Sequence, residues 1–141
     1  MNRNPTSSDP ARGRGSALPL CSARGRPSEI ALYIHIPFCQ TKCPYCDFNA
    51  YAGIESIIPS YTAALTSEID HWGALLGNPR VSTIFFGGGT PSYVPSHDLD
   101  SILKAAQSAF EIMPGAEITM EANPGDLLVN DVEYLTKLGI N

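Results

Sequence analysis

Short strand-like runs alternate with helix-like segments along this chain, and this alternation restricts its fold more than any other feature. Each run is rich in β-branched or aromatic residues and is bounded by proline or glycine, as is typical of buried strands. Strands are predicted at 30–36, 81–86 and 117–122. Because a helix-like segment follows each strand, the order βαβαβα predicts the α/β class, with a parallel sheet covered by helices.

The three helix-like segments carry apolar residues at spacings of three and four, which is the pattern of an amphipathic helix. In the first segment the apolar stripe comprises Ile54, Ile58, Tyr61, Leu65, Ile69, Trp72 and Leu76. Gly77 is predicted to end this helix, and Ser96 is predicted to cap the second. Asn130 and Glu133 are predicted to cap the third helix, which Gly139 ends.

An open doubly wound sheet and a slice of a β/α barrel both fit this order of elements. The chain stops at Asn141, where another strand would start, and two parallel strand edges would remain unpaired. The sequence therefore predicts that the chain is the N-terminal part of a longer protein.

Charge is unevenly distributed between the first 29 residues and the rest of the chain. Segment 1–29 holds five of the nine basic residues against two acidic ones, whereas segment 30–141 holds four basic and twelve acidic residues. Because segment 1–29 has little periodic apolar content, it is predicted to be a disordered extension before a globular unit at 30–141. The acidic unit is a poor match for a phosphate backbone, so no nucleic-acid partner is expected.

No segment approaches the roughly 20 consecutive apolar residues that cross a bilayer, and the start does not resemble a secretory signal. A cytoplasmic location is therefore expected, with membrane contact only through a partner. The Arg- and Ser-rich start also resembles an organellar transit peptide. It lacks a clear amphipathic period, so a plain flexible extension is favoured.

Three cysteines within eight residues, Cys39, Cys43 and Cys46, follow the first predicted strand. In a chain without a secretory signal, such a cluster favours metal binding over disulfides. Three thiolates can hold three irons of a [4Fe–4S] cubane and leave the fourth iron without a protein ligand, whereas a structural site closes all of its positions. The alternative is a non-enzymatic zinc-binding module in which His35 or Cys21 completes the site.

The spacing Cys-x3-Cys-x2-Cys resembles the signature of the radical S-adenosylmethionine (SAM) superfamily. Its context, Tyr33-Ile-His-Ile-Pro-Phe-Cys39, is similar to the oxygen-independent coproporphyrinogen III oxidase family. The resemblance covers roughly residues 30–141 and implies a partial (β/α) barrel, of which the chain holds three parallel βα units. Cys21 is expected to be a bystander in the extension, and His35 a buried, hydrogen-bonded histidine.

Two further motifs follow the second and third predicted strands. Glycines in the turn Gly87-Gly88-Gly89-Thr90-Pro91 let a ligand approach the backbone, and the turn resembles a superfamily motif whose backbone receives the amino group of SAM. Glu121, in Glu-Ala-Asn-Pro, matches a family position that contacts SAM, as do Tyr33 and Tyr45. Because parallel strands end at one edge of a sheet, the three motifs are expected at one mouth.

Within the family, the resemblance implies one of two functions. The oxidases decarboxylate two propionates of coproporphyrinogen III, and they carry an additional cysteine at the position that Phe48 occupies here. The ending Cys46-Asp47-Phe48 is closer to the related heme chaperones, which bind heme and pass it to recipient proteins. The resemblance therefore favours a heme chaperone, and the departure at Phe48 argues against porphyrinogen oxidation.

The resemblance also implies the cofactors and partners. They are a [4Fe–4S] cluster, SAM, heme or porphyrin in the full-length protein, a reductant protein for the cluster and a heme-recipient protein. In this superfamily SAM is cleaved reductively to methionine and a 5′-deoxyadenosyl radical. The family's heme-ligand motif lies beyond residue 141, so heme binding enters here only through the resemblance.

Overall fold

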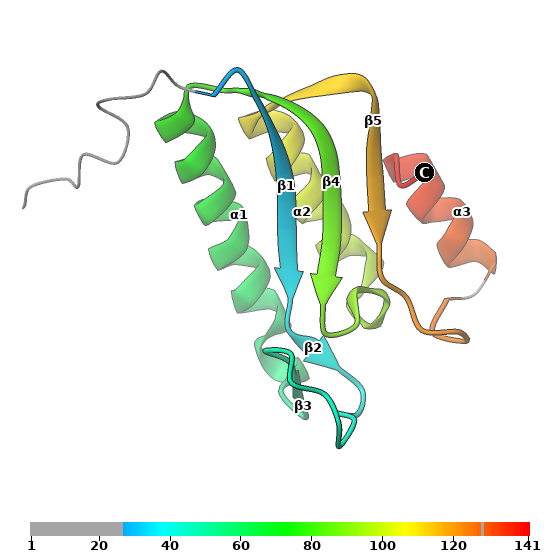
Figure 1. Cartoon of the computed structure of the whole chain (residues 1–141). Helices are drawn as coiled ribbons and strands as arrows, with labels where there is room; N and C mark the ends of the chain where they lie inside the picture. The colour runs from blue at the N-terminus through cyan, green and yellow to red at the C-terminus, as the bar shows by residue number, and fades with distance from the viewer. Residues whose placement is uncertain (1–26, 128) are drawn as a thin grey trace, which may run out of the picture.

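Three parallel strands form the sheet that positions the rest of the chain (Figure 1). They are β1 (Glu29–Ile36), β4 (Arg80–Gly88) and β5 (Glu111–Met120), in the order β1-β4-β5. The register pairs Tyr33 with Phe85, and Phe85 in turn with Thr119. The predicted parallel sheet is confirmed, and β1 and β5 are its edges within the residues that the computed structural model describes, 27–127 and 129–141.

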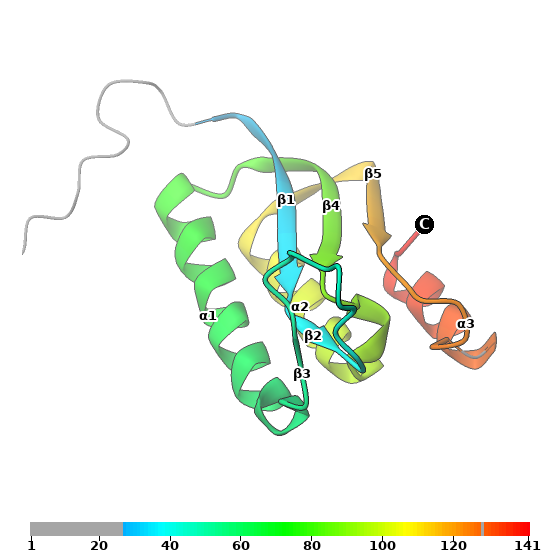
Figure 2. The same ribbon diagram turned by 60° about the horizontal axis from the view of Figure 1, so that its bottom comes forward.

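One helix follows each strand of this sheet, as the alternation predicts. The helices are α1 (Ile58–Leu76), α2 (Ser96–Ala109) and α3 (Val129–Leu138). Helices α1 and α2 lie side by side on one face of the sheet, and α3 lies beside β5 (Figures 1 and 2). The connections contain the short strands β2 (Phe38–Cys39) and β3 (Tyr51–Ala52) and the 3-10 turns η1 (Glu55–Ile57) and η2 (Pro91–Tyr93).

Only one face of the sheet is buried. Alternate residues of a strand point to opposite faces, and on the helix side Ile34 and Phe86 are buried in one core with Ile102 of α2. On the other face, the side chains of Tyr33 and Phe85 remain 58 % and 39 % exposed. In a (β/α) barrel, helices cover the outside, so this exposed face corresponds to the barrel interior.

The ends of the helices agree only partly with prediction. Gly77 ends α1 in the left-handed conformation, with φ of 78°, as predicted. The cap predicted at Ser96 is wrong, because α2 begins at Ser96 itself and Pro95 occupies the N-cap without a side-chain hydrogen bond. The cap predicted at Asn130 is also wrong, because α3 already begins at Val129.

The third strand is longer than predicted. β5 begins at Glu111 rather than at residue 117, and its register against β4 shifts between Val81 and Thr83. The residues at this shift include Pro114, which has no amide proton, and Gly115, whose φ is 77°. Both residues disfavour a regular ladder, so the sequence pattern indicates a strand only after them, whereas the chain bulges and continues.

The predicted extension meets the sheet at its last residues. Glu29, placed by prediction in the extension, opens β1, and the Ser28 carbonyl accepts a hydrogen bond from the Arg80 amide at 3.2 Å. Residues 1–26, including Cys21, lie outside the described part of the chain. In the described part, no helix is long and apolar enough to span a bilayer.

Candidate metal centre

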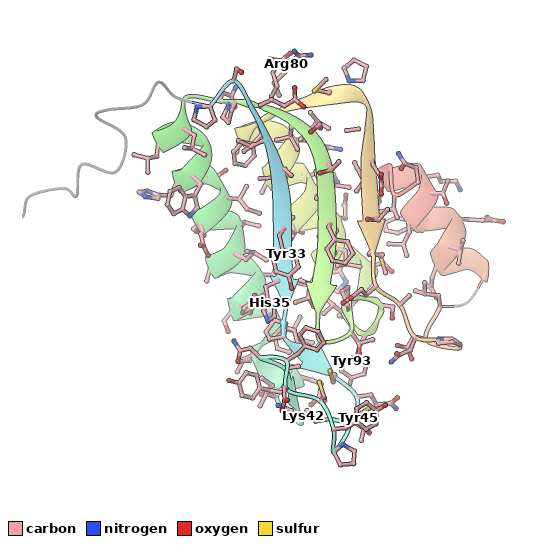
Figure 3. The ribbon with its side chains drawn as sticks, viewed as in Figure 1. Tyr33, His35, Lys42, Tyr45, Arg80 and Tyr93 are labelled. Atoms are coloured by element: carbon pink, nitrogen blue, oxygen red, sulfur yellow. The ribbon has the colours of Figure 1, made fainter. Side chains whose placement is uncertain are left out.

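A cleft of about 300 Å³ lies at the carboxyl ends of the three parallel strands. It is lined by Cys39, Thr41, Lys42, Cys43, Cys46, Phe48, Gly88, Gly89, Thr90, Glu121, Ala122 and Asn123. Figure 3 shows this end of the molecule around Lys42 and Tyr45, opposite the end that carries Arg80. The cysteines, the glycine turn and Glu121 thus come together at the edge where strand topology predicts them.

The three cysteines of the cleft differ in exposure, and none of them forms a disulfide. Cys39 is buried, Cys46 is half-buried and Cys43 is exposed. A turn joins the last two, because the Cys46 amide donates to the Cys43 carbonyl at 3.0 Å and Pro44 takes the second position, where proline is favoured. In the described residues, no three His, Cys, Asp or Glu side chains are grouped to hold a metal ion. A cubane makes a different demand from a single ion, because each cysteine binds a separate iron.

The glycine turn packs directly on the segment that carries Cys39. The Gly89 amide donates to the Ile36 carbonyl at 2.8 Å, and the Thr90 amide donates to the Phe38 carbonyl at 2.8 Å. A Cβ atom added to Gly89 would lie 2.7 Å from the Phe38 oxygen. Glycine is therefore required here for close approach of the protein's own backbone, a role that the sequence pattern does not distinguish from approach of a ligand.

Glu121 joins the third strand to the glycine turn. Its amide donates to the Phe86 carbonyl at 3.0 Å, and its Oε2 accepts a hydrogen bond from the Gly88 amide at 2.9 Å. Gly88 has a φ of 122°, and an added Cβ would lie 2.5 Å from the His35 ring. The Glu121 carboxylate is therefore held beside the turn, although Glu121 itself is an exposed residue in the segment that follows β5.

His35, near the end of β1, is hydrogen-bonded to the loop that carries the cysteines. Its Nε2 lies 2.8 Å from the Asn49 carbonyl, which can only accept, so Nε2 carries a proton. In the neutral ring Nδ1 then accepts, and the Tyr33 hydroxyl, 3.0 Å away, donates to it. His35 is hydrogen-bonded as predicted, but it is only partly buried, which corrects the expectation of a buried histidine.

The two tyrosines predicted to contact SAM do not line the cleft. Tyr33 lies on the exposed face of the sheet, with its ring centroid 5.9 Å from that of Phe85. Tyr45 is 84 % exposed, and its hydroxyl donates to the Cys43 side chain, which raises the pKa of the phenol. The cleft instead contains Lys42, whose Nζ donates to the Phe48 carbonyl at 3.3 Å. Sequence patterns missed Lys42 because a lysine between two cysteines carries no signal of its own.

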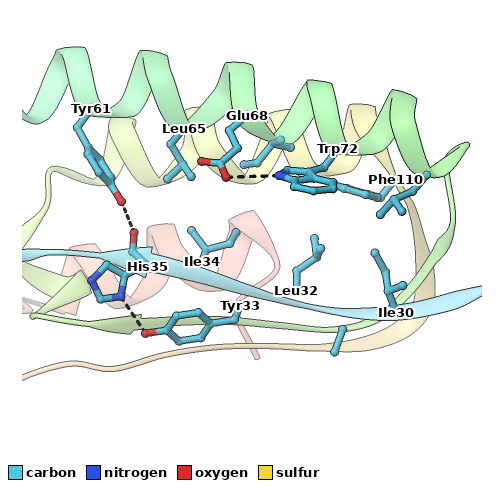
Figure 4. A pocket seen from close by; sticks show the side chains of 13 residues that line it. Ile30, Leu32, Tyr33, Ile34, His35, Tyr61, Leu65, Glu68, Trp72 and Phe110 are labelled. Carbon is cyan, nitrogen blue, oxygen red and sulfur yellow. Dashed lines mark hydrogen bonds between the residues drawn. The ribbon is translucent and has the colours of Figure 1, made fainter. Parts of the chain in front are cut away.

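A larger apolar groove of about 470 Å³ runs between β1 and α1 (Figure 4). Trp72, predicted on the apolar stripe of α1, lines this groove with other residues of that stripe and remains 43 % exposed. The Tyr61 hydroxyl donates to the His35 carbonyl at 2.6 Å, and burial raises the pKa of this phenol. The groove contains no cysteine and few polar groups, so the smaller cleft is the better candidate for metal chemistry.

The cleft offers the donor types that a [4Fe–4S] cluster and SAM require. Cysteine thiolates are the usual ligands of such clusters, and all three are free of disulfides. SAM carries an ammonium group, which needs acceptors, and the Glu121 carboxylate and the carbonyl groups of Gly88 and Gly89 are acceptors. The residues present therefore fit both groups.

Comparison with known proteins identifies the family to which the chain is similar. The sequence profile described as the radical SAM superfamily matches residues 33–141. "Heme chaperone HemW" of Escherichia coli (strain K12) is 39% identical over 114 residues, which cover 79% of this chain and 30% of the relative. "Heme chaperone HemW" of Mycobacterium tuberculosis is 40% identical over 108 residues, covering 74% of this chain and 27% of the relative.

A solved structure also resembles the fold. It is described as "Coproporphyrinogen III oxidase (HemN) from Escherichia coli is a Radical SAM enzyme", and it matches with a TM-score of 0.77 and 30% sequence identity. The match covers 84% of this chain and 28% of that structure. The chain thus spans less than a third of the length of the relatives it matches.

Proposed function

The chain belongs to the radical SAM superfamily, and we propose that the protein is a heme chaperone that carries a [4Fe–4S] cluster and SAM in the cleft at the strand ends. The family implies the cluster and SAM. The observation that carries the proposal is the convergence of three cysteines, a glycine turn and Glu121 on one cleft. The identity of 39% and 40% to proteins named heme chaperones favours that branch over the oxidase, to which the identity is 30%.

In this proposal the cysteines, the glycine turn and Glu121 each have a defined task. Cys39, Cys43 and Cys46 would each hold one iron, so that one iron stays open to the amino and carboxylate groups of SAM. Glu121 and the carbonyl groups of the glycine turn would accept hydrogen bonds from the ammonium group. When bound, the cluster and SAM supply reductive cleavage of the sulfonium, and the protein orients SAM and excludes water.

Tyr33 and Tyr45 are proposed to contact SAM, because they match family positions that do so. Tyr33 extends from the exposed face of β1, which would line the interior of the complete barrel. Tyr45 stands beside Cys43, at the exposed rim of the cysteine loop. Both side chains are accessible to a bound SAM molecule that extends out of the cleft, and further strands of the barrel would confine it.

Phe48 favours the chaperone over the oxidase. It lines the cleft and is 67 % exposed, at a position where the resemblance to the oxidases implies a further cysteine. A phenyl ring supplies neither a thiolate nor a proton, so chemistry that depends on that cysteine is not available here. The proposal also includes heme or porphyrin as the cargo. It includes a protein reductant and a heme-recipient protein as partners, and the cytoplasm as the location.

Heme binding by the full-length protein tests the choice of branch. The full-length protein is expected to bind heme, detected by its absorption spectrum, and not to convert coproporphyrinogen III when supplied with SAM and reductant. Formation of protoporphyrinogen with consumption of SAM would establish the oxidase instead. A protein that holds one zinc per chain, and no acid-labile sulfide after anaerobic reconstitution, would establish the zinc-binding module.

Glu121→Gln tests the proposed SAM contact. Glutamine keeps an oxygen that can accept from the Gly88 amide, so the fold should persist while the negative charge is lost. Because a hydrogen bond to a charged group contributes about 1.5–3 kcal/mol, SAM affinity is expected to fall about tenfold to a hundredfold. Binding of SAM to the reconstituted protein is measured by the change in the cluster's electron paramagnetic resonance spectrum. Glu117→Gln, a substitution within β5 and outside the cleft, is the matched control.

A further inference from the structure

The Thr90 side chain lies against the sulfur of a cluster ligand. Its Oγ1 is 3.6 Å from Cys39 Sγ, and both residues are buried, with 7 % and 9 % exposure. We infer that the Thr90 hydroxyl donates a hydrogen bond to the Cys39 thiolate and thereby raises the reduction potential of the cluster. This inference rests on the proposed function, since it requires a cluster held by Cys39.

The direction of this hydrogen bond follows from its surroundings. A thiolate bound to iron has no proton, so Cys39 can only accept, and the hydroxyl must donate. Asn123 Nδ2 donates to Thr90 Oγ1 at 3.5 Å, which occupies a lone pair of the hydroxyl oxygen and leaves its proton for the sulfur. Thr90 is thus oriented from one side by Asn123 and aimed at Cys39 on the other.

Asn123 is itself held by a further set of hydrogen bonds. Its backbone amide donates to Ser92 Oγ at 3.2 Å, and the Ser92 hydroxyl donates to Asp126 Oδ2 at 3.0 Å. These bonds join the loop after β5 to η2. They therefore hold in place the Asn123 residue whose side-chain amide orients Thr90. The network therefore runs from Asp126 to the sulfur of Cys39, with each donor having one acceptor.

The backbone groups of Thr90 have partners within the protein as well. Its amide donates to the Phe38 carbonyl at 2.8 Å, and its carbonyl accepts from the Tyr93 amide at 2.9 Å. The family resemblance places Thr90 among the SAM contacts, whereas its three polar groups face protein atoms here. Thr90 is thus a positioning residue for the cluster ligand, and SAM would meet Gly88, Gly89 and Glu121 instead.

A donor at Cys39 affects the two oxidation states of a cluster unequally. Reduction adds one negative charge, part of which resides on the ligand sulfurs, and a hydrogen bond stabilises the more negative state more strongly. Because the pair is buried, water does not screen this difference. Removal of the donor should therefore make the cluster harder to reduce.

Thr90→Val tests the inference, because valine has nearly the same shape but no hydroxyl. The reconstituted full-length protein is titrated anaerobically with reductant while electron paramagnetic resonance reports the reduced cluster. The equilibrium constant for one-electron reduction is expected to fall about tenfold, which corresponds to about 59 mV. Thr90→Ser keeps the donor and should restore the wild-type potential, and Asn123→Ala should lower the potential by a smaller amount.

The outcomes separate this inference from the proposed function. Equal potentials in wild type and Thr90→Val, with iron and sulfide contents unchanged, would overturn the inference and leave the proposed function standing. A full-length wild-type protein that assembles no cluster would overturn the proposed function itself. If Thr90→Val fails to hold a cluster, Asn123→Ala decides the matter, and an unchanged potential in that variant would refute the role of Thr90.

Discussion

Cys43→Ala is expected to abolish assembly of the [4Fe–4S] cluster, whereas Cys21→Ala is expected to leave it intact. In the proposed site each of the three clustered cysteines would supply the single protein ligand of one iron, so the loss of one would leave two irons without protein ligands. Cys43 is exposed, so its replacement by alanine creates no cavity in the core. A lost cluster in this variant would therefore reflect the missing ligand and not a damaged fold.

The measurement is the content of iron and acid-labile sulfide after anaerobic reconstitution, with the visible absorption that dithionite bleaches as a second readout. Circular dichroism before reconstitution should be the same for wild type and both variants. Loss of iron in Cys21→Ala would overturn the ligand assignment, because Cys21 lies outside the motif. Retention of full iron and sulfide in Cys43→Ala would equally contradict it.

Periodicity predicts the sheet because the residues on the buried face of a strand or helix are apolar and recur at the spacing of that element. Ile34 and Phe86, buried on one face of the sheet, are apolar for that reason, and the parallel arrangement followed from the alternation of strands and helices. The joint placement of the cysteines and Glu121 needed only the rule that parallel strands end at one edge. These inferences depend on local patterns and on topology, both of which a single sequence contains.

Contacts that depend on exact register could not be predicted in the same way. The hydrogen bond from the Gly88 amide to Glu121 requires that β4 and β5 be aligned after a bulge, and the bulge begins at residues that disfavour a strand. The contact between Thr90 and Cys39 joins positions 51 residues apart. Ser96 failed as a cap because a preceding proline took the cap position, which is a competition that propensities alone do not decide.

Gly89→Ala is expected to destabilise the chain by about 2–6 kcal/mol and to prevent the cluster from assembling. The added Cβ would lie 2.7 Å from the Phe38 oxygen and 3.0 Å from the Ile36 oxygen, and backbone atoms cannot rotate away as a flexible side chain can. Overpacking of this kind costs about 1–3 kcal/mol. The hydrogen bonds of the Gly89 and Thr90 amides would lengthen as well, at about 0.5–1.5 kcal/mol each.

Gly53→Ala separates crowding from backbone conformation. Gly53 has a φ of 76°, but a Cβ there would meet no atom within 4 Å, so alanine adds only the strain of the left-handed region, about 1–2 kcal/mol. The φ of Gly89 is not positive, so the destabilisation of Gly89→Ala arises from the steric contact of the added Cβ alone. Urea denaturation of both variants, with iron content measured in parallel, should show the larger shift in midpoint for Gly89→Ala and loss of iron only there. Equal shifts, with iron retained in both, would mean that the turn and the cysteine segment are not closely packed, and the cleft would lose the contact that fixes Cys39 beside Thr90.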